Sequence, residues 1–107
     1  MTPNQFKQQL RHRYVTASHQ LAQLKHQSLT PEDYQQIAND YTLGLVWSTV
    51  VTAPFEQHAS YQQLEQAMLL LERMLKNPDL INTFRRKSLY LRGQTAASKF
   101  RFNRPNN

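Results

Sequence analysis

Residues 60–77, SYQQLEQAMLLLERMLKN, carry signals for the start, the buried face and the end of one helix. Ser60 and Gln63 form the S-x-x-Q pattern of a capping box, and Pro78, which has no N–H, follows the last residue. Five large side chains recur at steps of three and four and share one face: Tyr61, Leu64, Met68, Leu71 and Leu75. Burying them would contribute roughly 7–15 kcal/mol before chain entropy is subtracted, so other elements must cover this face.

Two earlier positions carry equally clear helix starts. Thr2 precedes Pro3 with Gln5 three residues on, and Thr30 precedes Pro31 with acidic residues in the next two positions. With Gly93 as a helix C-terminal residue, the pattern predicts four helices, at residues 3–27, 31–52, 60–76 and 78–92.

Length and composition favour one helical domain. The 107 residues suffice for a single modest core, and two glycines leave little material for the turns of an all-β fold. Short connectors favour antiparallel neighbours. We therefore expect an all-α, antiparallel four-helix bundle over residues 1–93, with a basic and aromatic C-terminal arm or tail over residues 94–107.

The most apolar run is LGLVWSTVV, residues 43–51. Its β-branched residues are compatible with a short strand, but a strand would have no obvious partner, so we predict a buried helix end with Trp47 as a core anchor. The run is far shorter than the ~20 residues that a membrane-spanning helix needs, so no transmembrane segment is expected.

Enzymatic and metal-dependent functions find little support in the sequence. Cys is absent, which excludes a thiolate zinc site and fits a cytoplasmic location, and the polar N-terminus does not read as a secretory signal. His12, His19 and His26 are seven residues apart, and a rise of ~10.5 Å per step prevents any two from sharing an ion. No nucleophile, phosphate-loop or metalloprotease motif is present. We expect no enzyme activity, no catalytic residue, no metal and no cofactor.

The charge distribution is more informative than the net charge of +6. All seven acidic residues lie between residues 32 and 79, where two cations reduce the charge to −5, whereas residues 1–31 carry +4 and residues 80–107 carry +7. Either the basic ends fold back on the acidic middle, or the C-terminal arm meets an anionic partner.

The arm interleaves cations with aromatic rings, which suits phosphates and unpaired bases. The residues predicted to bind a polyanion, most of all nucleic acid, are Arg85, Arg86, Lys87, Tyr90, Arg92, Lys99, Phe100, Arg101, Phe102 and Arg104. No base-reading motif is present, so binding would depend on the phosphate backbone.

A protein-binding regulator is the alternative. In size, charge, lack of cysteine and helical plan the chain resembles the immunity proteins that protect bacteria from pediocin-like bacteriocins. No residue motif carries this resemblance, which implies a protein or membrane-associated partner contacted through Leu89 and the aromatic tail. Pairing of two copies across a two-fold axis is also open.

Overall fold

The computed structural model describes residues 2–25 and 28–102, with side chains up to residue 94. Its elements are α1 (Pro3–Ala22), α2 (Pro31–Leu43), the 3-10 helix η1 (Trp47–Thr49), α3 (Phe55–His58), α4 (Tyr61–Lys76) and α5 (Leu80–Phe102). All regular structure in these residues is helical, which confirms the all-α prediction. Across the same residues, no helix combines the length and the apolar character that crossing a membrane would require.

Each of the three predicted helix starts carries a capping box. The side chain of Thr2 accepts from the backbone N–H of Gln5, and the side chain of Gln5 accepts from the N–H of Thr2. The same reciprocal pair starts α2 between Thr30 and Asp33, and α4 at Ser60. Each pair satisfies N–H groups that the first helical turn leaves without a partner.

One core joins the helices. It contains the fully buried side chains of Tyr14 and Leu21 from α1, Tyr34 from α2, and Leu71 from α4. The ring of Phe55 from α3 stacks on Tyr14 with 5.8 Å between centroids. Trp47 is half-buried and meets Phe55 edge-on at 5.6 Å, so it packs against the core as predicted.

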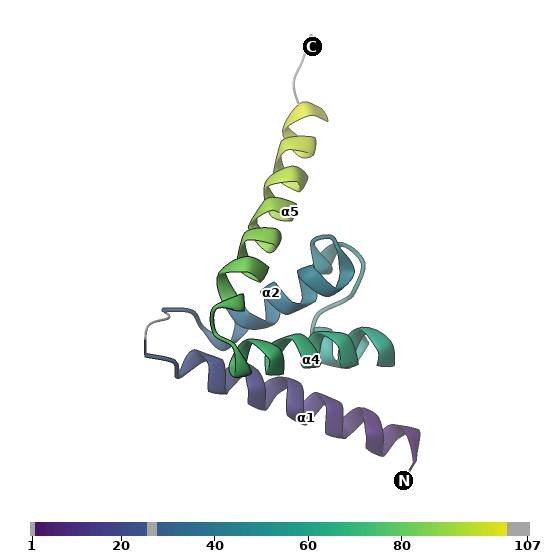
Figure 1. Ribbon diagram of the computed structural model, residues 1–107. Coiled ribbons are helices and arrows are strands. Elements are labelled where there is room, and N and C mark those ends of the chain that lie inside the picture. Colours follow the sequence, from purple (N-terminus) through teal and green to yellow (C-terminus); the bar gives the residue numbers. More distant parts are fainter. Residues whose placement is uncertain (1, 26–27, 103–107) are drawn as a thin grey trace.

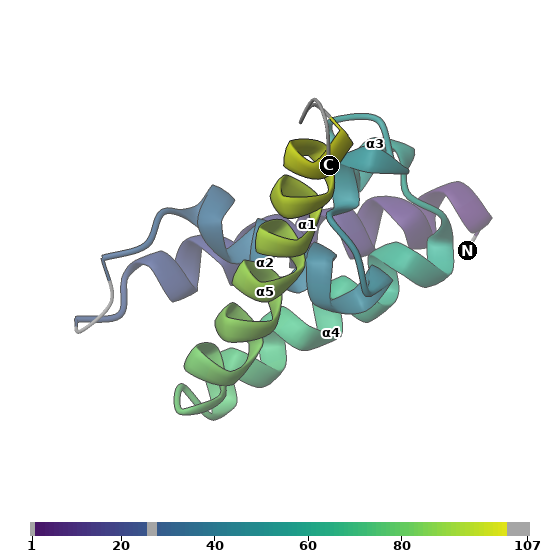
Figure 2. The ribbon, with the colours of Figure 1, turned by 90° about the horizontal axis from the view of Figure 1, so that it is seen from above.

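Helices α1 and α4 lie side by side and run in the same direction, with α2 packed against both in the opposite direction (Figure 1). Helix α5 rises steeply from this group and passes over α2, as the view from above shows (Figure 2). Helix α5 packs mainly against α2 and makes few contacts with α4, although α4 directly precedes it in the sequence. The antiparallel arrangement of four helices is therefore not confirmed, because α5 is packed across α2 instead of alongside α4.

The prediction that the second helix continues to residue 52 is wrong. Helix α2 stops at Leu43, and Gly44 takes the left-handed conformation with φ 70°. The following apolar run forms a loop with the short helix η1, which buries Val46 and Val51. A left-handed glycine ends a helix at little cost, and a run of β-branched residues gains little from continuing one.

Two other predicted boundaries are also wrong. Helix α1 ends at Ala22. Leu21 is the last side chain of its apolar face that is fully buried, so a further helical turn would gain little stability from packing. Helix α5 begins at Leu80, two residues late, and runs through Gly93 to Phe102. A glycine stops a helix only when it leaves the helical conformation, and Gly93 does not.

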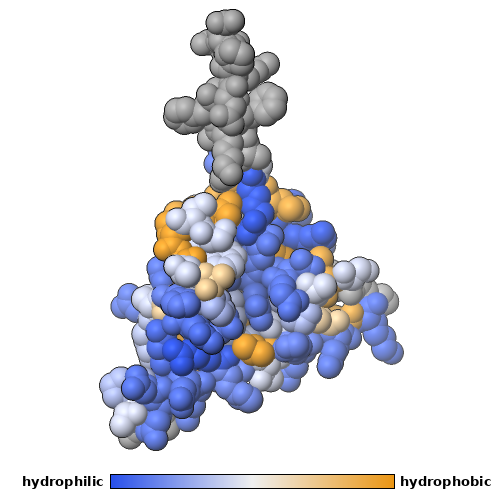
Figure 3. Space-filling model, turned by 180° about the vertical axis from the view of Figure 1, so that it is seen from behind, coloured by the Kyte–Doolittle hydropathy of each residue, from blue (hydrophilic) through white to orange (hydrophobic). Residues whose placement is uncertain are grey.

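Some apolar side chains of the predicted buried faces are exposed. Phe6 in the first turns of α1 and Tyr61 at the start of α4 both lie at helix ends and are exposed. On the face seen in Figure 3, hydrophobic surface is limited to separate spots on a mainly hydrophilic surface, several of them in the upper part of the coloured body. This face therefore presents no broad apolar area.

Candidate polyanion-binding surface

Helix α5 has one face buried on α2 and one face in solvent. Ile81, Phe84 and Ser88 are buried, and they recur at steps of three and four. The ring of Phe84 contacts Tyr41 of α2, with 4.5 Å between centroids. This packing fixes which residues of α5 point outward.

Three consecutive predicted cations, Arg85, Arg86 and Lys87, are exposed on α5. In the part of the chain that the structure describes, no ion pair joins any of the three to a carboxylate. The Nζ atom of Lys87 lies 5.4 Å from the centroid of the Tyr90 ring, which is exposed. These residues form what we call the α5 basic patch: Arg85, Arg86, Lys87 and Tyr90.

The remaining predicted polyanion ligands divide into two groups. The backbone at Lys99, Phe100, Arg101 and Phe102 is the last part of α5, but their side chains lie outside the described residues, as does all of Arg104. Arg92 is described, and it faces the interior contact between α5 and α2.

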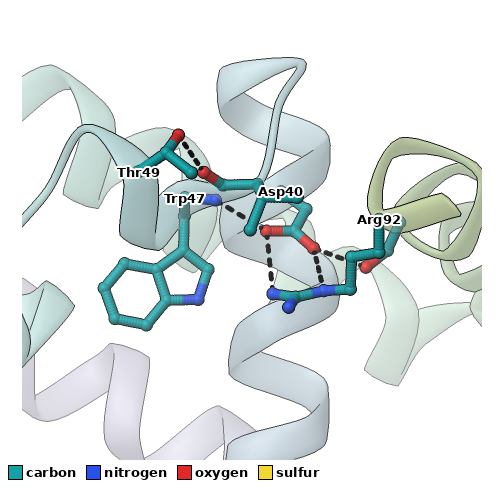
Figure 4. Close-up of polar contacts among 6 residues, drawn as sticks. Asp40, Trp47, Thr49 and Arg92 are labelled. Atoms are coloured by element: carbon teal, nitrogen blue, oxygen red, sulfur yellow. Dashed lines mark hydrogen bonds and ion pairs between the residues drawn. The ribbon is translucent and has the colours of Figure 1, made fainter. Parts of the chain in front are cut away.

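Arg92 is bound to a buried carboxylate. Asp40 on α2 is 0 % exposed and accepts hydrogen bonds from Arg92 Nε at 2.9 Å and from Nη2 at 3.3 Å. The same carboxylate accepts from Ser88 Oγ at 2.6 Å and from the backbone N–H of Trp47 at 2.9 Å (Figure 4). Removing a carboxylate from water is costly unless it is paired and hydrogen-bonded, and these four bonds satisfy that need.

Sequence reasoning missed this cluster, although one signal was present. Asp40 is three residues after the buried Ile37 and lies near the C-terminal end of α2, where the helix dipole disfavours a negative charge. An acid in that position requires compensation from outside its own helix. The compensating groups come from the η1 loop and from α5, so the cluster holds α2, the loop and α5 together.

The cations of α1 also have bonding partners within the molecule, which supports the view that the basic N-terminal end folds on the middle of the chain. Arg13 binds Glu72 of α4 through two hydrogen bonds, of 2.6 and 3.1 Å, and this contact raises the pKa of Arg13. Arg11 Nε donates to the carbonyl of Glu56, and Lys7 Nζ donates to the carbonyl of Ala59. Among the described residues, Arg85, Arg86 and Lys87 of the α5 basic patch have no such contacts.

Within residues 2–25 and 28–102, no three His, Cys, Asp or Glu side chains are grouped so that they could hold a metal ion. The chain matches no protein-family model, no curated protein and no solved structure.

Proposed function

We propose that the protein is a non-catalytic binding module that engages a polyanion through the α5 basic patch and the C-terminal arm. Nucleic acid is the first candidate for this polyanion. One observation carries the proposal. The cations of α1 and Arg92 have internal partners, whereas Arg85, Arg86 and Lys87 point into solvent with no carboxylate partner in the described part of the chain.

The course of α5 adds to this argument. The helix extends beyond the rest of the molecule (Figure 1), and its sequence continues with the cations Lys99 and Arg101. From Arg85 to Arg101 an α-helix rises about 24 Å, which is the length of roughly seven nucleotide steps at the spacing of one duplex strand. A single straight element could thus follow several consecutive phosphates.

The expected binding mode is sequence-tolerant. Arginine and lysine neutralise phosphates, and the exposed ring of Tyr90 offers a surface on which an unpaired base can stack. Phe100 and Phe102 would add two further rings to the same helix. Such a site prefers single-stranded or distorted nucleic acid because paired bases do not expose their faces.

Titration of labelled single-stranded and duplex oligonucleotides at increasing salt tests the proposal. Affinity should fall steeply with salt, and Arg85→Gln/Arg86→Gln should reduce the slope of log K against log salt by roughly 1.4 for single strands or 1.8 for duplex. Lys25→Gln/Lys76→Gln removes the same charge elsewhere and is the matched control. Equal loss in both variants, or no binding at low salt, would contradict the proposal.

A protein-binding regulator is the second candidate, favoured by the exposed Leu89 on α5. Its binding would persist at high salt and be lost in Leu89→Ala, because apolar contacts are not screened. A cytoplasmic location and pairing of two copies also belong to the proposal, and cell fractionation and sedimentation test them.

A further inference from the structure

A second surface lies away from the α5 basic patch. A groove of about 570 Å³ runs along the outward side of α4, from Gln66 to Lys76, and is bounded on its other side by the last turn of α2. The apolar side chains along it include Tyr41, Leu69 and Leu70. Tyr41 is 40 % exposed and Leu69 is 49 % exposed, although Leu69 lies in the middle of the most apolar helix of the chain.

The rim of this groove is positively charged. Arg73 and Lys76 lie along its α4 side. The one acidic residue that lines it, Glu72, is bound to Arg13 of α1 by an ion pair of 2.6 Å. Arg73 lies over the ring of Phe84 at 6.0 Å, and neither Arg73 nor Lys76 has a carboxylate partner among the described residues.

We infer that this groove binds an acidic amphipathic helix of another protein. The groove spans eleven residues of α4, a rise of about 15 Å or roughly three helical turns. Its walls are half exposed, which suits a helix that lays one apolar face along the groove better than a small molecule that must be enclosed. The unpaired Arg73 and Lys76 then meet acidic residues on the flanks of the bound helix.

Charge also argues against a second copy of this chain as the occupant. Residues 1–31 and 80–107, which include α1 and α5, contain no Asp or Glu. Either helix would bring further positive charge to a rim that is already positive, and like charges in contact oppose association. The charge argument therefore excludes α1 and α5 of a second copy as the occupant, and it favours a helix of another protein that carries acidic residues on its flanks.

A display selection tests the inference directly. The probe is a library of 16-residue helical peptides with Leu, Ile, Met or aromatic residues at positions i, i+3, i+4 and i+7, and Glu, Asp, Gln and Ala elsewhere. A matched library replaces Glu and Asp with Lys and Arg. The acidic library should yield binders that shift the amide resonances of residues 41–43 and 66–76, and the basic library should not.

Two variants locate the selected binders. Leu69→Ser should weaken them by about tenfold or more, because it removes the central apolar contact. Val50→Ser, at an exposed apolar residue outside the groove, should leave affinity unchanged. Lys76→Glu should weaken the acidic peptides at low salt and have less effect at high salt.

Several outcomes would overturn the inference. It is wrong if neither library yields a binder, if basic peptides bind as well as acidic ones, or if Leu69→Ser binds as tightly as the parent. Dodecanoate serves as a third probe, which tests whether the groove binds a small amphiphile instead of a helix. If it shifts the groove resonances and the acidic peptides do not, the groove takes a small amphiphile and the helix proposal fails.

Discussion

Arg92 of α5 and Asp40 of α2, 52 residues apart in the chain, form a two-point ion pair in which the carboxylate is fully buried. The pair joins α5 to α2, and α5 itself extends beyond the body (Figure 1). The pair therefore orients the helix on which the α5 basic patch stands.

Asp40→Asn should lower the free energy of unfolding by about 2 kcal/mol, because Arg92, whose side chain is 31 % exposed, loses its counter-charge and the buried Ser88 hydroxyl loses a charged acceptor. Urea unfolding followed by circular dichroism measures the change. Glu65→Gln, which neutralises a partly exposed acid on α4, is the control and should stay within about 0.5 kcal/mol of the parent. An equally small effect of Asp40→Asn would show that the buried pair adds nothing to stability.

Ser88 and Asp40 should behave as one unit. Ser88→Ala removes the 2.6 Å hydrogen bond to Asp40 and should cost roughly 1–2 kcal/mol. Combined with Asp40→Asn, it should show a coupling energy of about 1 kcal/mol in a double-mutant cycle. Ser18 is equally buried but bonds to Val15 and Gln35, so Ser18→Ala with Asp40→Asn should be additive. Additivity in both cycles would mean that Ser88 acts independently of the carboxylate.

The two glycines should respond to alanine in opposite directions. Gly93→Ala should stabilise the protein by about 0.5–1 kcal/mol, since Gly93 lies within α5 and a Cβ there would meet nothing within 4 Å. Gly44→Ala should destabilise it by roughly 1 kcal/mol or more, because φ is +70° at that position. Thermal unfolding of both variants checks the signs, and a loss of stability in Gly93→Ala would indicate that α5 ends there in solution.

Stability should fall above pH 10, because burial raises the pKa of Tyr14 above its ordinary value of 10.0, and burial raises the pKa of Tyr34 in the same direction. The folded state keeps both protons while the unfolded state loses them. Each tyrosine therefore removes up to about 1.4 kcal/mol per pH unit from pH 10 upward, and the full stability is present below pH 10.

Tyr14→Phe tests whether Tyr14 contributes to the loss of stability above pH 10. At neutral pH it should cost about 1–2 kcal/mol, because Asn39 loses the hydrogen bond from the Tyr14 hydroxyl. Above pH 10 its stability should decline less steeply than that of the parent, as urea unfolding at several pH values would show. Tyr61→Phe, at an exposed tyrosine, should keep the parental slope. If Tyr14→Phe keeps it too, Tyr14 is not the group responsible.

The sequence predicted the exposure of some site residues but not the internal pairing of another. Exposure of Arg85, Arg86 and Lys87 follows from their spacing around Ile81 and Phe84, so the helical repeat was sufficient to place them. Whether they bind a polyanion stays a prediction. The pairing of Arg92 could not be read from the repeat, because its partner is on another helix.

The exposed groove was also beyond the sequence. Leu69 lies outside the predicted buried face that contains Leu64 and Met68, so the helical repeat is consistent with its exposure. The repeat does not place Tyr41 of α2 beside it, because that contact depends on how α2 packs against α4.

What the sequence determined by itself is where the first, second and fourth α-helices begin. The helix starts at Thr2, Thr30 and Ser60 form as predicted, because the capping box at each needs only two residues three positions apart. The tertiary structure decided that Asp40 is buried and that α5 crosses α2. Those outcomes depend on hydrogen bonds between residues about 50 positions apart, and no local pattern specifies such partners.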